Sequence, residues 1–164
     1  HFPGHGSARD DSHQGMTDVT DTWSDDELEP YRRILGQGYK GAIMTAHVFN
    51  RRLDEAYPAT LSPRTISILR DEMGYEGVIF SDDMQMKAIA SEYGLEDAII
   101  RCINAGVDVL CFGNNLSYDE QIPEKFQAIV LKAVEDGRIK PARIEEAYTR
   151  VMRLKGQLTE EGSN

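Results

Sequence analysis

Short apolar runs alternate with amphipathic stretches along most of this chain. Three runs, GAIMTAHV, GVIFSDDM and GVDVLCFGNN, each suit a strand that is buried on both faces. Between and after them, apolar residues recur at helical spacing, which predicts helices over residues 24–36, 62–73, 95–104, 122–136 and 141–155. Because strands that alternate with helices pair in parallel through right-handed crossovers, the pattern predicts an α/β fold.

Local signals mark where these helices begin and end. Ser24 and Glu27 match a capping box, in which each side chain accepts a hydrogen bond from a free backbone N–H. Ser62 before Pro63 is a cap followed by proline at the first helical position, where the missing N–H costs nothing. Glycines are expected to close the helices, at Gly36 or Gly38, Gly74, Gly106 and Gly137.

Each apolar run gives way to polar residues at its C-terminal end. These ends read Thr45-Ala46-His47, Ser81-Asp82-Asp83 and Gly113-Asn114-Asn115. The first residues, HFPGHG, have the character of the tail of one more strand. A (β/α)8 barrel and an open α/β sheet both place their chemistry at the carboxyl ends of the strands, so we expect a site there.

Composition narrows the function classes. The sequence has 164 residues, enough for one domain, and a formal net charge of -10, which argues against a nucleic-acid partner. Its apolar runs are far shorter than the roughly 20 residues of a membrane-spanning helix. Cys102 and Cys111 lack the C-x-x-C spacing of redox or metal sites, and we expect both to be buried free thiols.

The first thirteen residues, HFPGHGSARDDSH, are rich in candidate chemistry. His1, His5, Asp10, Asp11 and His13 suggest a metal hydrolase as one hypothesis. The segment nevertheless lacks the paired histidines on a helix that zinc peptidases use, and its proline and glycines predict a loop. We therefore expect no metal and no cofactor.

Six short motifs together resemble a known family. HFPGHG followed by DSH, then MTAHV, PATLS, GYEGVIFSDDM and AGVDVL, resemble the catalytic barrel of family 3 glycoside hydrolases, in its β-N-acetylhexosaminidase (β-N-acetylglucosaminidase) branch. The resemblance implies the second half of a (β/α)8 TIM barrel, about four β/α units, over residues 1–156, with a polar tail over 157–164. On this interpretation, residue 1 is a cut edge within a longer barrel.

The resemblance also implies roles for three catalytic residues. Asp82, the first aspartate of Ser-Asp-Asp, matches the nucleophile that forms a glycosyl ester. His13 matches the acid/base, and Asp11 would orient its imidazole and raise its proton affinity. We expect Asp83 to form local hydrogen bonds beside the nucleophile, as an aspartate at a turn does.

Further residues are candidates for substrate contact. The resemblance implies that His1 contacts sugar hydroxyls, while His47 either contacts substrate or packs beneath the catalytic loop. Met84 is a candidate wall of the substrate pocket, with the core as its alternative place. Asn114 is expected in a turn or local cap, and Trp23 as a hydrophobic staple onto the helix that follows it.

The implied function is that of a retaining, exo-acting β-N-acetylglucosaminidase that hydrolyses terminal β-linked N-acetylhexosamine from carbohydrate derived from bacterial cell walls. The alternatives are a β-glucosidase-like enzyme, a phosphorolytic member of the family, and a half-barrel that only folds or self-associates. We expect this chain to need the first half of the barrel for activity, and to self-associate or pair with such a half. The sequence leaves the compartment, cytoplasmic or exported, undecided.

Overall fold

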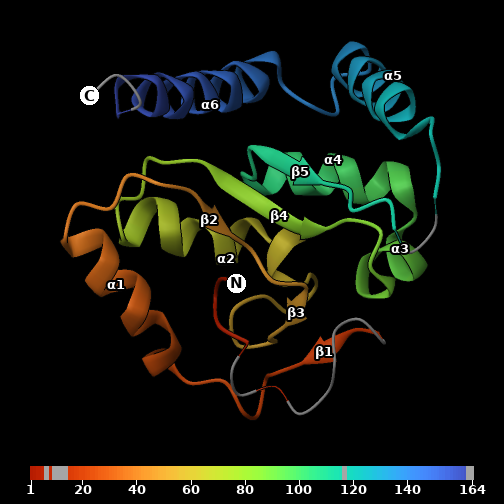
Figure 1. The fold of residues 1–164 in the computed structure, drawn as a ribbon. Helices are drawn as coiled ribbons and strands as arrows, with labels where there is room; N and C mark the ends of the chain where they lie inside the picture. Colours follow the sequence, from red (N-terminus) through yellow and green to blue (C-terminus); the bar gives the residue numbers. More distant parts are fainter. Residues whose placement is uncertain (6–7, 9–14, 116–117, 162–164) are drawn as a thin grey trace.

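The chain folds into alternating strands and helices, with parallel strands at its centre (Figure 1). The computed structural model describes residues 1–5, 8, 15–115 and 118–161. The strands are β1 (Thr17–Asp18), β2 (Ile43–Met44), β3 (Val48–Phe49), β4 (Ile79–Asp83) and β5 (Val109–Cys111). The α-helices are α1 (Glu29–Gly36), α2 (Pro63–Ser67), α3 (Lys87–Tyr93), α4 (Leu95–Ala105), α5 (Ile122–Glu135) and α6 (Pro141–Glu161). Three shorter helical turns are η1 (Asp25–Leu28), η2 (Ala59–Leu61) and η3 (Ile68–Glu72).

The main sheet consists of β2, β4 and β5 in that order, all parallel. Phe2 extends it by a parallel bridge to Thr45, so HFPGHG does supply the end of one more strand segment. Four parallel segments therefore lie side by side in the order in which the chain makes them, as consecutive β/α units of a barrel do. The predicted α/β fold with about four such units is confirmed.

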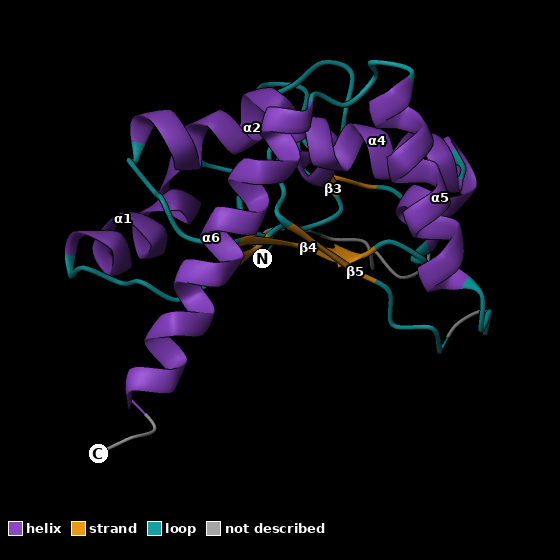
Figure 2. Cartoon of the chain, turned by 90° about the horizontal axis from the view of Figure 1, so that it is seen from above, coloured by secondary structure: helices purple, strands orange, loops and turns teal. Residues whose placement is uncertain are grey.

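Helices cover one face of this sheet. Figure 2 shows α2 and α4 together on one side of β4 and β5, and Figure 1 views the sheet from the opposite side. The largest side chains of the interior are fully buried, among them Phe2, Leu69, Ile79 and Ile99. Burial of each such side chain stabilises the fold by about 1.5–3 kcal/mol, so the apolar strand residues fix the sheet against its helices.

The local signals at the helix ends are mostly confirmed. The Ser62 side chain accepts a hydrogen bond of 2.9 Å from the N–H of Thr65, and Pro63 opens α2. Gly106 closes α4 with a φ of 112°, a conformation that a residue with a Cβ atom rarely adopts. Gly38, Gly74 and Gly137 follow their helices with positive φ in the same way.

Three local predictions were wrong, and one helix was not predicted. The Ser24 side chain makes no cap hydrogen bond, because the Glu27 N–H donates to the backbone carbonyl of Ser24 instead; the Glu27 side chain lies against Gly4. The run 41–48 is not one strand: it leaves the main sheet after Thr45, and β3 pairs with β1 instead. Helix α3 was not predicted, and α6 continues past residue 155 to Glu161.

No helix in the described part of the chain is long and apolar enough to cross a membrane.

A buried carboxylate ties the amino ends of the strands together. The Asp108 side chain is completely buried and lies 2.7 Å from Arg70, 2.8 Å from Arg143 and 3.1 Å from Arg150. It also accepts a hydrogen bond of 3.0 Å from the backbone N–H of Ile79. Since these donors come from η3, α6 and β4, Asp108 joins the two strands β4 and β5 to η3 and α6.

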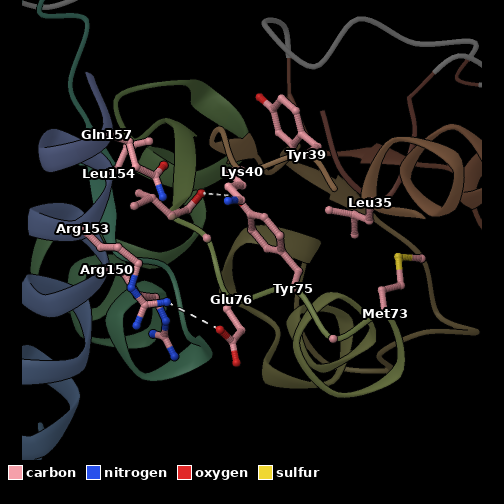
Figure 3. A pocket seen from close by; sticks show the side chains of 13 residues that line it. Leu35, Tyr39, Lys40, Met73, Tyr75, Glu76, Arg150, Arg153, Leu154 and Gln157 are labelled. Atoms are coloured by element: carbon pink, nitrogen blue, oxygen red, sulfur yellow. Dashed lines mark hydrogen bonds and ion pairs between the residues drawn. The ribbon is translucent and has the colours of Figure 1, made fainter. Parts of the chain in front are cut away.

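A pocket of about 420 Å³ opens beside this cluster. Figure 3 shows Arg150 and Arg153 of α6 on one side of it and Tyr39, Lys40 and Tyr75 on the other. Lys40 precedes β2, and Tyr75 precedes β4, so this pocket lies at the amino ends of the strands. It is therefore at the opposite end of the sheet from the predicted chemistry.

Candidate active site

The carboxyl ends of the strands bring His1, Asp82, Asp83 and Gly113 together. A β-bulge in β4 shapes this end: Phe80 pairs with Val109, yet the next pair is Asp83 with Cys111. Three steps along β4 therefore match two along β5. A bulge of this kind bends the strand and redirects its side chains.

The Ser81 side chain fills the gap that the bulge leaves in the ladder. Ser81 is fully buried, and its hydroxyl oxygen accepts a hydrogen bond of 2.8 Å from the N–H of Cys111. The ladder resumes where the N–H of Met84 donates to the carbonyl of Cys111 at 2.9 Å. The serine of the Ser-Asp-Asp motif is thus a structural partner of β5.

Asp82 presents its carboxylate at the strand end. Its Oδ1 accepts a hydrogen bond of 2.8 Å from the N–H of Asp83, and its Oδ2 lies 3.6 Å from Nε2 of His1. The side chain of Asp82 is 16% exposed, whereas that of His1 is 50% exposed. One carboxylate oxygen is therefore anchored to the backbone, and the other faces an accessible imidazole.

Asp83 forms the local hydrogen bonds that the sequence predicts. Its Oδ1 accepts from the N–H of Gln85 at 3.0 Å and from the N–H of Gly113 at 3.1 Å. The first bond closes a turn after β4, and the second reaches the segment after β5. Asp83 therefore holds two loops together beside Asp82.

His47 lies beneath this strand end rather than at its surface. It is fully buried, with Nδ1 2.9 Å from Oγ1 of Thr60 and Nε2 2.9 Å from the carbonyl oxygen of Asp83. Burial lowers the pKa of His47, and the hydrogen bond to Asp83 and the nearby Asp82 and Asp83 carboxylates partly oppose that effect. Both ring nitrogens are occupied by protein groups, so the geometry favours packing beneath the loop over direct contact with substrate.

Other candidates are also placed by the fold. Met84 is 2% exposed and belongs to the core cluster, which favours the core over the pocket wall. Asn114 is in a turn, as predicted, with a φ of 53° and side-chain hydrogen bonds to the backbone of Asp119. Trp23 is buried, and its indole N–H donates to the carbonyl of Pro3 at 2.9 Å, so it supports the loop that carries His1.

Asp11 and His13 lie outside the described residues, as does Asp10. Their predicted roles as orienting carboxylate and acid/base stay predictions. Within the described residues, no group of three or more His, Cys, Asp or Glu side chains is arranged to hold a metal ion. Cys102 is a buried free thiol, as expected, whereas Cys111 is only partly buried.

Sequence reasoning missed Thr60 and Gln85. Thr60 is a fully buried polar residue of η2 in the PATLS motif, and Gln85 accepts a hydrogen bond of 2.6 Å from the N–H of Asn114. The PATLS motif contributed to the family resemblance, but its sequence does not indicate which side chain Thr60 contacts. The signal that was available is a threonine within an otherwise apolar, helix-preceding segment.

Comparisons with known proteins identify the family of this chain. A family model described as the glycosyl hydrolase family 3 N terminal domain matches residues 1–154. The Beta-hexosaminidase LpqI of Mycobacterium tuberculosis is 31% identical over 164 residues, which cover 95% of this chain and 41% of that protein. The Beta-hexosaminidase of Tolumonas auensis is 40% identical over 119 residues, covering 70% of this chain and 35% of that protein. This chain thus spans well under half the length of these curated relatives.

Solved structures match as well. A glycoside hydrolase family 3 β-N-acetylglucosaminidase from Paenibacillus sp. FPU-7 superposes with a TM-score of 0.83 at 34% identity, covering 95% of this chain and 30% of that one. The β-N-acetylglucosaminidase from Thermotoga maritima gives a TM-score of 0.80 at 31% identity, covering 94% and 33% of the two chains. Together with the match over residues 1–154, these similarities establish that the chain belongs to glycosyl hydrolase family 3, within its N-terminal domain.

Proposed function

We propose that this chain carries the nucleophile of a retaining, exo-acting β-N-acetylglucosaminidase. The observation that carries the proposal is the Asp82 carboxylate at the end of β4, with Oδ1 held by the Asp83 N–H and Oδ2 facing His1. A retaining glycosidase needs such a carboxylate below the anomeric carbon, held in place and open on one oxygen. The names of the similar proteins, β-hexosaminidase and β-N-acetylglucosaminidase, support N-acetylhexosamine as the sugar.

The reaction proceeds in two steps on this proposal. Asp82 Oδ2 attacks the anomeric carbon and forms a glycosyl ester, while His13 protonates the departing glycosidic oxygen. His13 then removes a proton from water, which attacks the anomeric carbon and releases the Asp82 carboxylate. Asp11 orients the imidazole of His13, as a carboxylate does in hydrolase triads.

His1 is proposed to bind the terminal sugar. Its imidazole is half exposed and lies 3.6 Å from the nucleophile, so a hydroxyl group of a sugar bound over Asp82 is within its reach. The substrate class we propose is terminal β-linked N-acetylhexosamine from cell-wall carbohydrate. Phosphate as the acceptor in place of water is the alternative outcome, and turnover in phosphate compared with an inert buffer distinguishes the two.

We also propose that activity needs further β/α units to complete a barrel around this site. The half-buried side chains of β5, from Val109 to Cys111, form the last described strand of the main sheet. Another set of strands, from a second copy or from the first half of a barrel, would cover this edge. Analytical ultracentrifugation of the 164-residue chain tests this: a compact, stable monomer contradicts the proposal.

The function is tested by substituting the nucleophile in the complete polypeptide that its gene encodes. Asp82→Asn should lower kcat on an aryl β-N-acetylglucosaminide by roughly four orders of magnitude, because the ester cannot form. Intact-protein mass spectrometry with a slow substrate should detect an added N-acetylhexosaminyl group on the wild type only. Asp136→Asn, which removes an exposed ion pair with Lys132, is the control. Near-normal turnover by Asp82→Asn would overturn the assignment.

His13 is tested by the leaving group. His13→Ala should lose activity on substrates whose leaving group needs a proton, and should retain the first step on aryl glycosides with very acidic phenols. Equal losses on both kinds of substrate would contradict the acid/base role.

A further inference from the structure

A buried hydrogen-bond chain runs from η2 to the backbone beside Asp82. Its members are Thr45, Thr60 and His47, all with no exposed surface, and the peptide groups of Asp83. Oγ1 of Thr60 lies 2.8 Å from Oγ1 of Thr45, 2.9 Å from Nδ1 of His47 and 3.0 Å from the carbonyl oxygen of Ala46. No step of the proposed reaction uses these groups.

The protons in this hydrogen-bond network can be assigned from the contacts. The carbonyl oxygen of Asp83 only accepts, so Nε2 of His47 carries a proton and donates it across 2.9 Å. The ring is fully buried, which favours its neutral form, so we assign Nδ1 as the acceptor in its 2.9 Å contact with Thr60. The acceptor at Nδ1 selects one orientation of the Thr60 hydroxyl.

Thr60 has a single hydroxyl proton and two acceptors within reach. If that proton went to the carbonyl of Ala46, the bare Nδ1 of His47 would face an oxygen lone pair. A proton on the Thr60–His47 line removes that repulsion and satisfies a fully buried ring nitrogen. The hydroxyl of Thr45 then donates to Thr60, so its proton is used as well.

This hydrogen-bond network ends at the carboxylate of Asp82. His47 holds the carbonyl of Asp83, while the N–H of the same residue donates to Oδ1 of Asp82 at 2.8 Å. The side chain of Asp83 is fixed separately by Gln85 and Gly113. Asp83 is therefore restrained at its carbonyl and its side chain, and its N–H is left directed at the neighbouring carboxylate.

We propose that Thr60 is a positioning residue for Asp82. Its hydroxyl donates to Nδ1 and so stabilises the His47 tautomer whose Nε2–H holds the Asp83 carbonyl, and this keeps the Asp83 N–H on Oδ1 and leaves Oδ2 free to face the sugar. The inference rests on the proposed function, in which Asp82 is the nucleophile. It adds a specific requirement: the attack geometry depends on a hydroxyl that never touches the substrate.

The test compares Thr60→Val with Thr60→Ser in the complete polypeptide. Valine keeps the shape and removes the hydroxyl, so kcat should fall about 10- to 100-fold while KM changes little, because a misplaced nucleophile affects the attack and not the binding. Serine keeps the hydroxyl and should restore kcat to within about threefold of the wild type. Thr65→Val, at a buried threonine of α2 outside this network, is the matched control and should keep the wild-type kcat.

A second measurement does not depend on a substitution. Long-range ¹H–¹⁵N correlation spectra of the imidazole in the wild-type protein should show His47 neutral, with its proton on Nε2. A proton on Nδ1, or on both nitrogens at neutral pH, would overturn the proposal even if Thr60→Val failed to fold. An unchanged kcat for a folded Thr60→Val variant, or a rise in KM alone, would also overturn it.

The two proposals fail in different ways. If Asp82→Asn keeps its activity, the nucleophile assignment fails, whatever Thr60→Val does. If Asp82→Asn is inactive and Thr60→Val has normal kinetics, only the positioning role of Thr60 fails.

Discussion

Gly113 and Asp83 are in close contact at the carboxyl ends of the last two strands. The N–H of Gly113 donates to Oδ1 of Asp83 at 3.1 Å, and a Cβ atom built on Gly113 would lie 2.6 Å from Oδ2 of the same carboxylate. A side chain at position 113 would therefore collide with the Asp83 carboxylate, which the N–H of Gly113 binds. This contact explains the glycine by close approach, since Gly113 is not among the glycines with positive φ.

Gly113→Ala is expected to destabilise the protein by about 1–3 kcal/mol, because the methyl group forces the Asp83 carboxylate or the loop to move. The urea midpoint measures this. Gly156→Ala in α6 is the control: apart from the helix's own backbone and the adjacent residues, no atom of the described part of the chain lies within 4 Å of its Cβ position, and the substitution should stabilise the helix by about 0.5–1 kcal/mol. Equal midpoints for wild type and Gly113→Ala would show that the close contact carries no cost.

Ser81→Ala is expected to cost about 1–3 kcal/mol, because it leaves the N–H of Cys111 without its hydrogen-bond partner in a buried ladder. Amide hydrogen exchange at Cys111 should accelerate along with the loss of stability. Ser91→Ala, which removes an exposed hydroxyl within α3, should change neither quantity appreciably. Unchanged protection of the Cys111 amide would contradict the role given to Ser81.

The buried ring of His47 predicts a pH dependence of stability. Its pKa in the folded protein lies below the ordinary value of 6.5, so below that pH the unfolded chain takes up a proton that the folded protein resists. The stability that the neutral His47 ring contributes is therefore fully present above about pH 6.5. As the pH falls below that value, the free energy of unfolding decreases by at most about 1.4 kcal/mol per pH unit. Urea unfolding of wild type and His47→Gln between about pH 8 and pH 5.5 should give a smaller slope for the variant. Parallel curves would refute the prediction.

Asp108→Asn is expected to destabilise the protein by about 3–5 kcal/mol, because Arg70, Arg143 and Arg150 would lose the one buried carboxylate that all three contact. Thermal unfolding measures the loss. Asp136→Asn, at an exposed ion pair with Lys132, should leave the unfolding temperature almost unchanged. A similar small effect for both substitutions would mean that the arginines find other partners.

Local signals sufficed for much of the fold. Ser62 caps α2 and Gly106 ends α4 because these choices depend on a few neighbouring residues. The order of the main-sheet strands β2, β4 and β5, and of the helices α1, α2, α4, α5 and α6, followed from periodicity and from glycine and proline signals. The capping box at Ser24 was wrong because the chain forms a tight helical turn there, in which the Glu27 N–H donates to the Ser24 backbone carbonyl, while the Glu27 side chain lies against the distant Gly4.

The site was predictable in part for the same reason. Asp82 and His1 were both expected at the carboxyl ends of parallel strands, and their side chains lie 3.6 Å apart. The place of His47 was left open between two roles, because its partners Thr60 and Asp83 lie 13 and 36 positions away. The bulge in β4 was not expected, since it depends on the register between β4 and β5 and not on the amino-acid sequence of β4 alone.

That bulge makes the length of the Ser-Asp-Asp segment as important as its composition. In a regular strand, consecutive side chains point to opposite faces, so two adjacent aspartates could not serve neighbouring loops. Here the extra residue lets Asp82 face His1 while Asp83 binds Gly113. Deleting one residue of this segment would remove the bulge and turn the remaining side chains to other faces of the sheet, so the site depends on the spacing of the segment as well as on its residue types.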